Sequence, residues 1–108
     1  MDMHRLAEER SLAYHRVIAA RLGEDPTVLE QARARVREWV AVPGPVPHYA
    51  RAWAALLGRP VAEIVTFLTD PGERARELRQ STPFAGVIPP RERWGIWRAV
   101  RDRLTRPQ

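Results

Sequence analysis

The sequence of 108 residues contains no cysteine, no lysine and no long apolar run. Without cysteine there is no disulfide, no thiolate zinc site and no thiol nucleophile, so we expect a reducing compartment such as the cytoplasm. The most apolar stretch, 61–68, is far too short to cross a bilayer. Residues 1–10 lack the apolar core of a secretion signal. We therefore expect a cytoplasmic protein that has no membrane partner.

Motifs that carry catalysis or hold a cofactor are missing as well. His4, His15 and His48 are scattered without a His-Glu-x-x-His pattern, and no segment has the spacing of a calcium loop or a glycine-rich phosphate loop. Ser11 and Ser81 have no nearby base in the sequence that could activate a hydroxyl. The sequence therefore predicts no catalytic residue, no metal and no cofactor. A small enzyme is the least favoured alternative, because it requires a histidine and a carboxylate assembled in one pocket.

Arginine is the residue that the chain has in abundance. All 18 basic residues other than histidine are arginines, against 13 acidic residues, and the formal net charge is +5. A guanidinium stays charged at ordinary pH, and its planar fork suits carboxylates, phosphates and aromatic faces. The positive excess favours an acidic partner. It does not choose between nucleic acid and an acidic protein surface.

Apolar residues recur at helical spacing in successive segments, and strand-like alternation is absent. A chain of this length fits one domain with one core. We predict an all-α, compact single-domain bundle of five or six short helices over residues 1–104, with a frayed tail at 105–108. His15 lies beside the apolar face of the first helix, and we interpret it as a histidine at the edge of the core. The helices are predicted at about 4–22, 26–40, 49–57, 60–68, 73–80 and 90–104.

Proline and capping residues set the ends of these helices. Asp25 followed by a proline predicts the N-cap of the second helix. Asp70, with Glu73 three positions on, predicts a capping box for the fifth. Three prolines within 42–47 prevent helix and predict a stiff connector. The helix at 60–68 is apolar around most of its circumference, so we expect it at the buried centre.

The segment from Ser81 to Pro89 is the first candidate site, because its prolines keep it out of helix and predict extended backbone. Two interpretations of its apolar residues stay open. In one, Phe84 and Ile88 close the open end of the helical core. In the other, Phe84 binds in a partner protein or lines a groove beside Trp94.

The last helix carries the aromatic and cationic residues of this candidate site. On a helical projection Trp97 faces the core, whereas Trp94 lies at its border among arginines and stacks with Arg98. Arginine and tryptophan are the residues that most often dominate interface energies. The alternative is that Trp94 packs beneath the preceding helix. The predicted partner-binding residues are Phe84, Arg91, Arg93, Trp94, Arg98 and Arg101.

The second helix carries Arg33, Arg35 and Arg37, a basic stripe that is compatible with phosphate binding and that is more simply a solvated face. The helices at 49–57 and 60–68 superficially match a helix-turn-helix, but the second one lacks donors for base edges. The alternative to a protein partner is therefore a nucleic-acid binder that contacts phosphates without reading sequence. It would use arginines of the second and last helices.

Residues 9–16 and 78–86, running into Arg91-Glu92-Arg93-Trp94, resemble a family of small arginine-rich proteins of high-GC bacteria. The resemblance covers most of the chain and implies an antitoxin-like protein, which wraps or plugs its partner with helices and extended segments. Phe84 and Trp94 would suit such contacts. We thus expect a non-catalytic, regulatory protein-binding module whose partner is an acidic or nucleotide-handling protein. Self-association through the same patch, as a homo-oligomer, is a further alternative.

Overall fold

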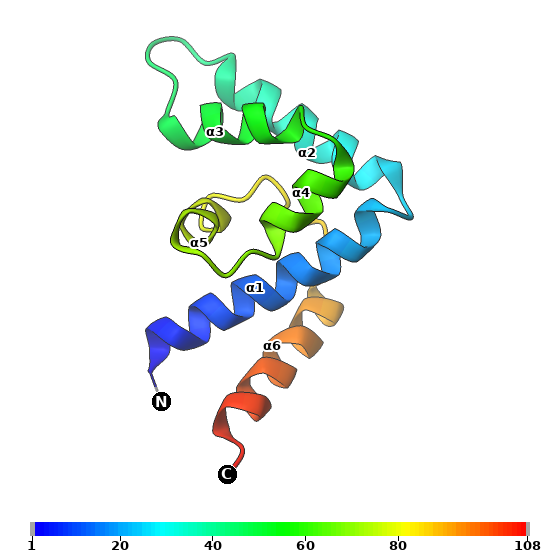
Figure 1. Ribbon diagram of the computed structural model, residues 1–108, viewed down its shortest axis with the longest axis vertical. Helices are drawn as coiled ribbons and strands as arrows, with labels where there is room; N and C mark the ends of the chain where they lie inside the picture. The colour runs from blue at the N-terminus through cyan, green and yellow to red at the C-terminus, as the bar shows by residue number, and fades with distance from the viewer. Residues whose placement is uncertain (1, 108) are drawn as a thin grey trace.

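The computed structural model describes residues 2–107, and within them it has six helices and no strand (Figure 1). The predicted all-α single-domain fold is confirmed, with the larger of the two expected helix numbers. The last helix includes Thr105, whose hydroxyl donates to the carbonyl of Arg101 at 2.9 Å, so this helix ends one residue later than predicted. The helices are α1 (Met3–Leu22), α2 (Pro26–Val40), α3 (His48–Leu57), α4 (Val61–Leu68), α5 (Glu73–Arg79) and α6 (Pro90–Thr105).

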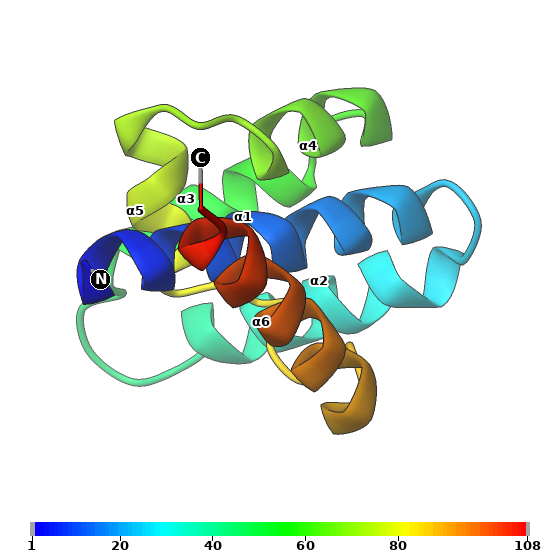
Figure 2. The same ribbon diagram turned by 90° about the horizontal axis from the view of Figure 1, so that it is seen from below.

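Helix α1 is the central element of the bundle. It packs against α2, α4, α5 and α6, and Figures 1 and 2 show it running through the middle of the molecule. The expectation that the 60–68 helix is the buried centre is wrong. Ile64 and Leu68 are fully buried, but Val61 is 40% exposed. At eight residues α4 is too short to be enclosed by neighbours, whereas the 20 residues of α1 offer a surface for four of them.

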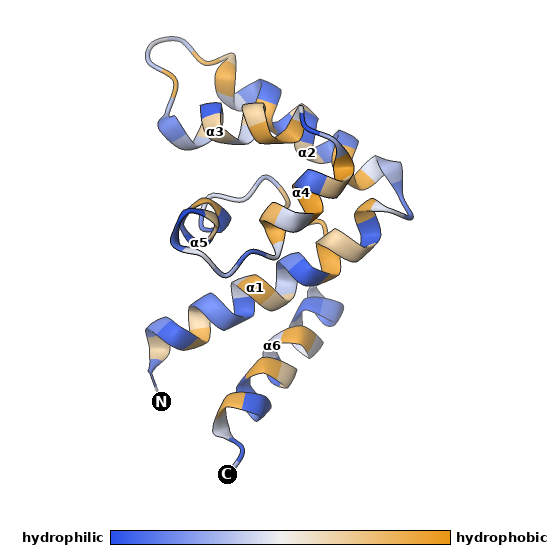
Figure 3. Ribbon diagram, in the orientation of Figure 1, coloured by the Kyte–Doolittle hydropathy of each residue, from blue (hydrophilic) through white to orange (hydrophobic). Residues whose placement is uncertain are grey.

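The core is built from one face of each helix, and apolar residues recur along every helix rather than in one block (Figure 3). Trp53 is fully buried at its centre, and its indole donates to the carbonyl of Leu78 at 3.1 Å. The rings of Phe67 and Phe84 lie edge-on to Trp53, with centroids 6.0 and 6.2 Å away. This arrangement satisfies the only polar atom of the indole and uses the favourable edge-to-face geometry of aromatic rings.

The two predicted helix caps have different outcomes. Asp25 caps α2 by accepting from the backbone N–H of Thr27 at 2.9 Å, as predicted. The side-chain and backbone hydrogen bonds from Thr27 lower the pKa of Asp25. The capping box at the start of α5 is wrong. Asp70 accepts from the N–H of Gly72 at 2.7 Å, and Gly72 itself is the N-cap, without a side-chain bond. The helix starts too late for the Asp70 carboxylate to reach its first turn.

Candidate functional site

The 81–89 segment turns inward instead of lying extended. The N–H of Val87 donates to the carbonyl of Phe84 at 3.3 Å, and Gly86 between them has a φ of +80°, which a side chain would disfavour. Phe84 and Ile88 are buried in the core. The prediction that Phe84 contacts a partner is therefore wrong, and the segment closes the helical core instead. The prolines exclude helix here, but they also permit a tight turn.

Two consecutive residues of α1 hold this turn. The hydroxyl of Tyr14 donates to the carbonyl of Phe84 at 2.6 Å and accepts from the N–H of Ile88 at 3.4 Å. Next to it, His15 lies within 2.8 Å of the Thr82 hydroxyl, whose oxygen accepts from the N–H of Phe84. The backbone at both ends of the turn is thus bonded to α1.

The partners of His15 define its tautomer. Nδ1 lies 2.7 Å from the carbonyl of Ser11, which can only accept, so Nδ1 carries the proton. Nε2 is then free to accept from the Thr82 hydroxyl. Burial lowers the pKa of His15 to about 4, although the bond to Ser11 opposes this shift; nearby Arg79 lowers it further. The ring is therefore neutral at pH 7, and both of its nitrogens are hydrogen-bonded inside the fold.

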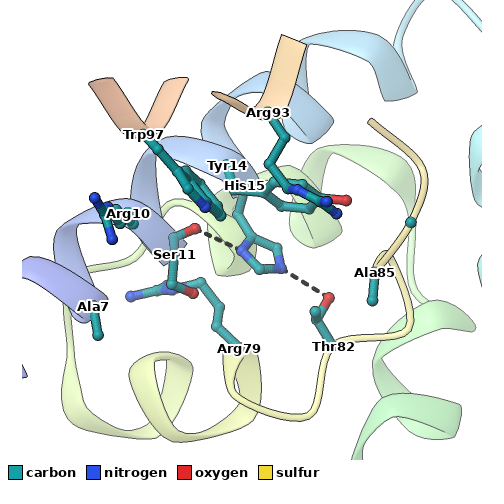
Figure 4. Close-up of a pocket in the computed structure, with 11 residues that line it drawn as sticks. Ala7, Arg10, Ser11, Tyr14, His15, Arg79, Thr82, Ala85, Arg93 and Trp97 are labelled. Atoms are coloured by element: carbon teal, nitrogen blue, oxygen red, sulfur yellow. Dashed lines mark hydrogen bonds between the residues drawn. The ribbon is translucent and has the colours of Figure 1, made fainter. Parts of the chain in front are cut away.

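A pocket of about 390 Å³ lies between α1, α6 and the turn (Figure 4). Trp97 of α6 and Tyr14 of α1 form part of its apolar wall, with ring centroids 6.1 Å apart. Arg10, Arg79 and Arg93 also line it, and none of its lining residues is acidic. The pocket therefore combines an apolar wall with three guanidinium groups. Neither Arg10 nor Arg79 had a candidate role in the sequence, because nothing local connects them with Arg93.

The other predicted residues of α6 lie outside this pocket. Trp94 is 61% exposed, and Arg91, Arg98 and Arg101 are exposed too. The stacking of Trp94 with Arg98 does not occur in the described chain. A cation–π contact is formed instead by Arg10, whose Cζ lies 5.9 Å from the ring centroid of Trp97. Trp97 is partly buried and packs against the core as predicted.

The arginines of α2 do not form a free basic stripe. Nη1 of Arg35 donates to the carbonyls of Pro83 and Ala85 at 3.2 and 2.6 Å, so Arg35 supports the turn from the α2 side. Nε of Arg33 donates to the carbonyl of Leu57 at 3.1 Å, and its Nη1 pairs with Glu30. Of the three arginines proposed for phosphates, Arg37 is exposed and has no such bond within residues 2–107.

The role of Arg35 is testable. We expect Arg35→Gln to lower the free energy of unfolding by about 1 kcal/mol, because two carbonyls of the turn lose a charged donor. Arg37→Gln removes the same charge from the same helix and should change stability by less than about 0.5 kcal/mol. Urea unfolding followed by circular dichroism compares the two variants. Equal effects would show that Arg35 is a surface charge like its neighbour.

Over residues 2–107 there is no cluster of three or more His, Cys, Asp or Glu side chains that could hold a metal ion. None of the helices in this range has the length and apolar character to cross a membrane. A scan against protein-family models gave no match, and neither curated proteins nor solved structures gave a significant match.

Proposed function

We propose that this chain is a non-catalytic protein-binding module of the cytoplasm, antitoxin-like in its action, which binds an acidic partner protein through one face of α6. The observation that carries the proposal is Trp94, the most exposed aromatic side chain in the described chain, at 61%. A large apolar ring held in water favours a partner that buries it. Phe84 takes no part in this face, since it belongs to the core.

The residues around Trp94 form a continuous stripe, which we call the Trp94 face: Arg91, Trp94, Arg98 and Arg101. Their spacing of three, four and three residues places them within about 80° of one another around the helix. All four are exposed. Tryptophan and arginine are also the two side chains most enriched among residues that dominate binding energies. The face is therefore suited to a protein surface that offers an apolar pocket ringed by carboxylates.

The charge of the Trp94 face is less interrupted than the sequence alone indicates. Glu92 lies beside the face in the sequence, but its carboxylate pairs with the guanidinium of Arg21 at the end of α1. This hydrogen bond raises the pKa of Arg21. Glu92 is engaged with α1, and the exposed Asp102 offsets part of the charge, but three arginines still give the face a positive charge that attracts an acidic partner.

Affinity capture from the source organism, followed by mass spectrometry, tests this function. We expect wild type to retain a protein partner that the double variant Trp94→Ala/Arg98→Glu loses by at least tenfold. The matched control is Tyr49→Ala/Arg51→Glu on α3, which also removes an exposed ring and reverses one exposed charge. Circular dichroism confirms that both variants remain folded. Undiminished capture by the α6 variant would contradict the proposal.

A nucleic-acid partner gives a different result in the same experiment. Phosphate contacts release counterions, so retention on mixed DNA and RNA would fall by orders of magnitude between low and moderately high salt. An interface centred on a tryptophan should respond only modestly to salt. Retention of nucleic acid with that steep salt dependence would favour the rival function. Concentration-dependent self-association that disappears in the α6 variant would identify a second copy as the partner.

A further inference from the structure

The pocket beside α6 concentrates positive charge, and no acidic side chain lines it. We call it the arginine pocket and define it by Arg10, Arg79, Arg93, Tyr14 and Trp97, whose side chains surround one space in Figure 4. The guanidiniums come from α1, α5 and α6, and no carboxylate lines the space with them. Three like charges around one cavity repel one another, and an anion in the cavity would relieve this repulsion.

The carboxylates closest in sequence pair with arginines outside the pocket. Glu9 pairs with Arg103 at 3.0 Å, and Glu8 lies 3.6 Å from Arg76. Glu92 on α6 pairs with Arg21. None of these three carboxylates lines the pocket, although burial lowers the pKa of Arg79 and the charges of Asp70 and Glu8 act against that shift. The fold therefore brings three arginines to a cavity whose lining contains no carboxylate.

Two of the guanidiniums also have unmet hydrogen-bonding capacity. Arg79 is only 4% exposed, and its Nη1 donates to the carbonyls of Leu68 and Asp70 at 3.3 and 2.6 Å. Its Nε–H and the Nε–H of Arg10 are buried without an acceptor in the described chain. Buried donors are nearly always paired in folded proteins, since leaving one unpaired costs about 1–3 kcal/mol. An anion that draws these guanidiniums toward the cavity would supply the acceptors.

Arg93 is the guanidinium best placed to respond to a ligand. It is partly exposed, lines the cavity, and runs from α6 to lie beside Tyr14 (Figure 4). Among residues 2–107 it has no ion pair and no side-chain hydrogen bond. A guanidinium with no internal partner is free to bind a carboxylate through two parallel N–H···O hydrogen bonds.

The shape of the pocket selects more than a bare anion. Trp97 and Tyr14 contribute aromatic rings to the lining, and the small residues Ala7, Ala85 and Gly86 also line the space. The volume of about 390 Å³ lies in the range of small-molecule sites. An inorganic ion would leave the Trp97 wall unoccupied. A flat apolar body attached to an anionic group would cover the wall and reach the guanidiniums at the same time.

The pocket is built for binding rather than for a reaction. Ser11 and His15 both line it, but the His15 ring bonds the backbone carbonyl of Ser11 through Nδ1 and the Thr82 hydroxyl through Nε2. The oxygen of the Thr82 hydroxyl also accepts from the N–H of Phe84 within the turn, and a ring with a pKa of about 4 is a weak base at pH 7, so Thr82 and His15 make a poor nucleophile and base. We propose that the arginine pocket binds a small organic anion, an aromatic carboxylate or a carboxylate of similar shape, with its ring on Trp97 and its carboxylate held by Arg93 and Arg10.

Titration with 1-naphthoate, 1-naphthalenemethanol and inorganic phosphate tests the proposal. Two-dimensional ¹H–¹⁵N spectra follow the indole N–H of Trp97, assigned with Trp97→Phe, and the Nε–H groups of the arginines. We expect saturable binding of 1-naphthoate that shifts these signals and is at least tenfold tighter than that of the uncharged alcohol. Arg93→Gln and Arg10→Gln should each weaken 1-naphthoate by about tenfold to a hundredfold, the effect of losing a charged hydrogen bond.

The control is Arg51→Gln, which removes the same charge from an exposed position on α3 and should bind 1-naphthoate as wild type does. Equal affinity for the acid and the alcohol would overturn the role of the arginines. Phosphate binding as tight as that of 1-naphthoate would overturn the role of the Trp97 wall. An Arg51→Gln effect as large as that of Arg93→Gln would reduce the binding to overall charge and overturn the site. Trp94→Ala should not change the binding of 1-naphthoate. The proposal for this pocket and the proposal for the Trp94 face are therefore tested independently.

Discussion

Phe84→Ala is expected to lower the free energy of unfolding by about 3–5 kcal/mol, the range for removing a fully buried phenylalanine ring. Phe84 has no exposed surface, and its ring lies edge-on to Trp53 and to His15, with centroids 6.2 and 6.5 Å away. Its carbonyl also accepts from Tyr14, so a shift of the backbone would loosen the turn. Because small domains are stable by about 5–15 kcal/mol, the loss is a large share of the total.

Urea unfolding followed by circular dichroism measures this effect. The matched control is Phe67→Ala, which removes the same ring from a partly exposed position against the same tryptophan. We expect Phe67→Ala to cost clearly less, about 1–3 kcal/mol, because part of that ring already faces water. If Phe84→Ala left the urea midpoint unchanged and abolished partner capture, Phe84 would be a surface contact and the described packing of the turn would be incorrect.

The second large effect is a loss of about 3 kcal/mol of stability between pH 6.5 and pH 4 that depends on His15. In the folded protein burial lowers the pKa of His15 to about 4, whereas the ordinary value is 6.5. The unfolded chain therefore takes up a proton first as the pH falls. The contribution of His15 to the free energy of unfolding is complete above pH 6.5. It declines between pH 6.5 and pH 4 and levels off below about pH 4. The difference of about 2.5 pH units corresponds to about 3 kcal/mol.

Burial is the main cause of this lowered pKa, and the hydrogen bond at Nε2 also disfavours a second proton on the ring. Protonation of Nε2 would place a second N–H against the Thr82 hydroxyl, which would have to rotate to accept it. The Thr82 oxygen already accepts from the N–H of Phe84, so it would lose its own acceptor and gain a competing donor. The positive charge of Arg79 nearby opposes protonation as well.

Urea midpoints measured from pH 7.5 to pH 3.5 test this dependence, and NMR titration of the ring gives the pKa of His15 directly. We expect His15→Gln to be less stable at pH 7 and to lose most of the pH dependence in this interval. His48→Gln removes an exposed histidine and should keep the wild-type profile. A His15 ring that titrates near pH 6.5 would contradict the description of the site.

The helices and most of their ends were predictable from the sequence, because the interactions that define them are local. The Asp25 cap bonds a residue two positions away, and Pro90 begins α6 because proline suits a first helical turn. The exposure of Trp94 and the burial of Val100 follow from the periodicity of one helix. Even the local rules failed at Asp70, where a proline and a glycine follow and the N-cap of α5 lies two positions further on, at Gly72.

Only the tertiary structure decided the direction of the 81–88 turn and the composition of the arginine pocket. The bonds that hold the turn join Tyr14 to positions 70 and 74 residues away, and Arg35 to a carbonyl 50 residues away. Such contacts have no periodicity in the chain, because they depend on how α1, α2 and α6 pack together. The sequence by itself determined six helices and a basic surface. Packing determined which apolar groups and which arginines face the solvent, a partner or the core, since a side chain's surroundings depend on distant residues that no local pattern specifies.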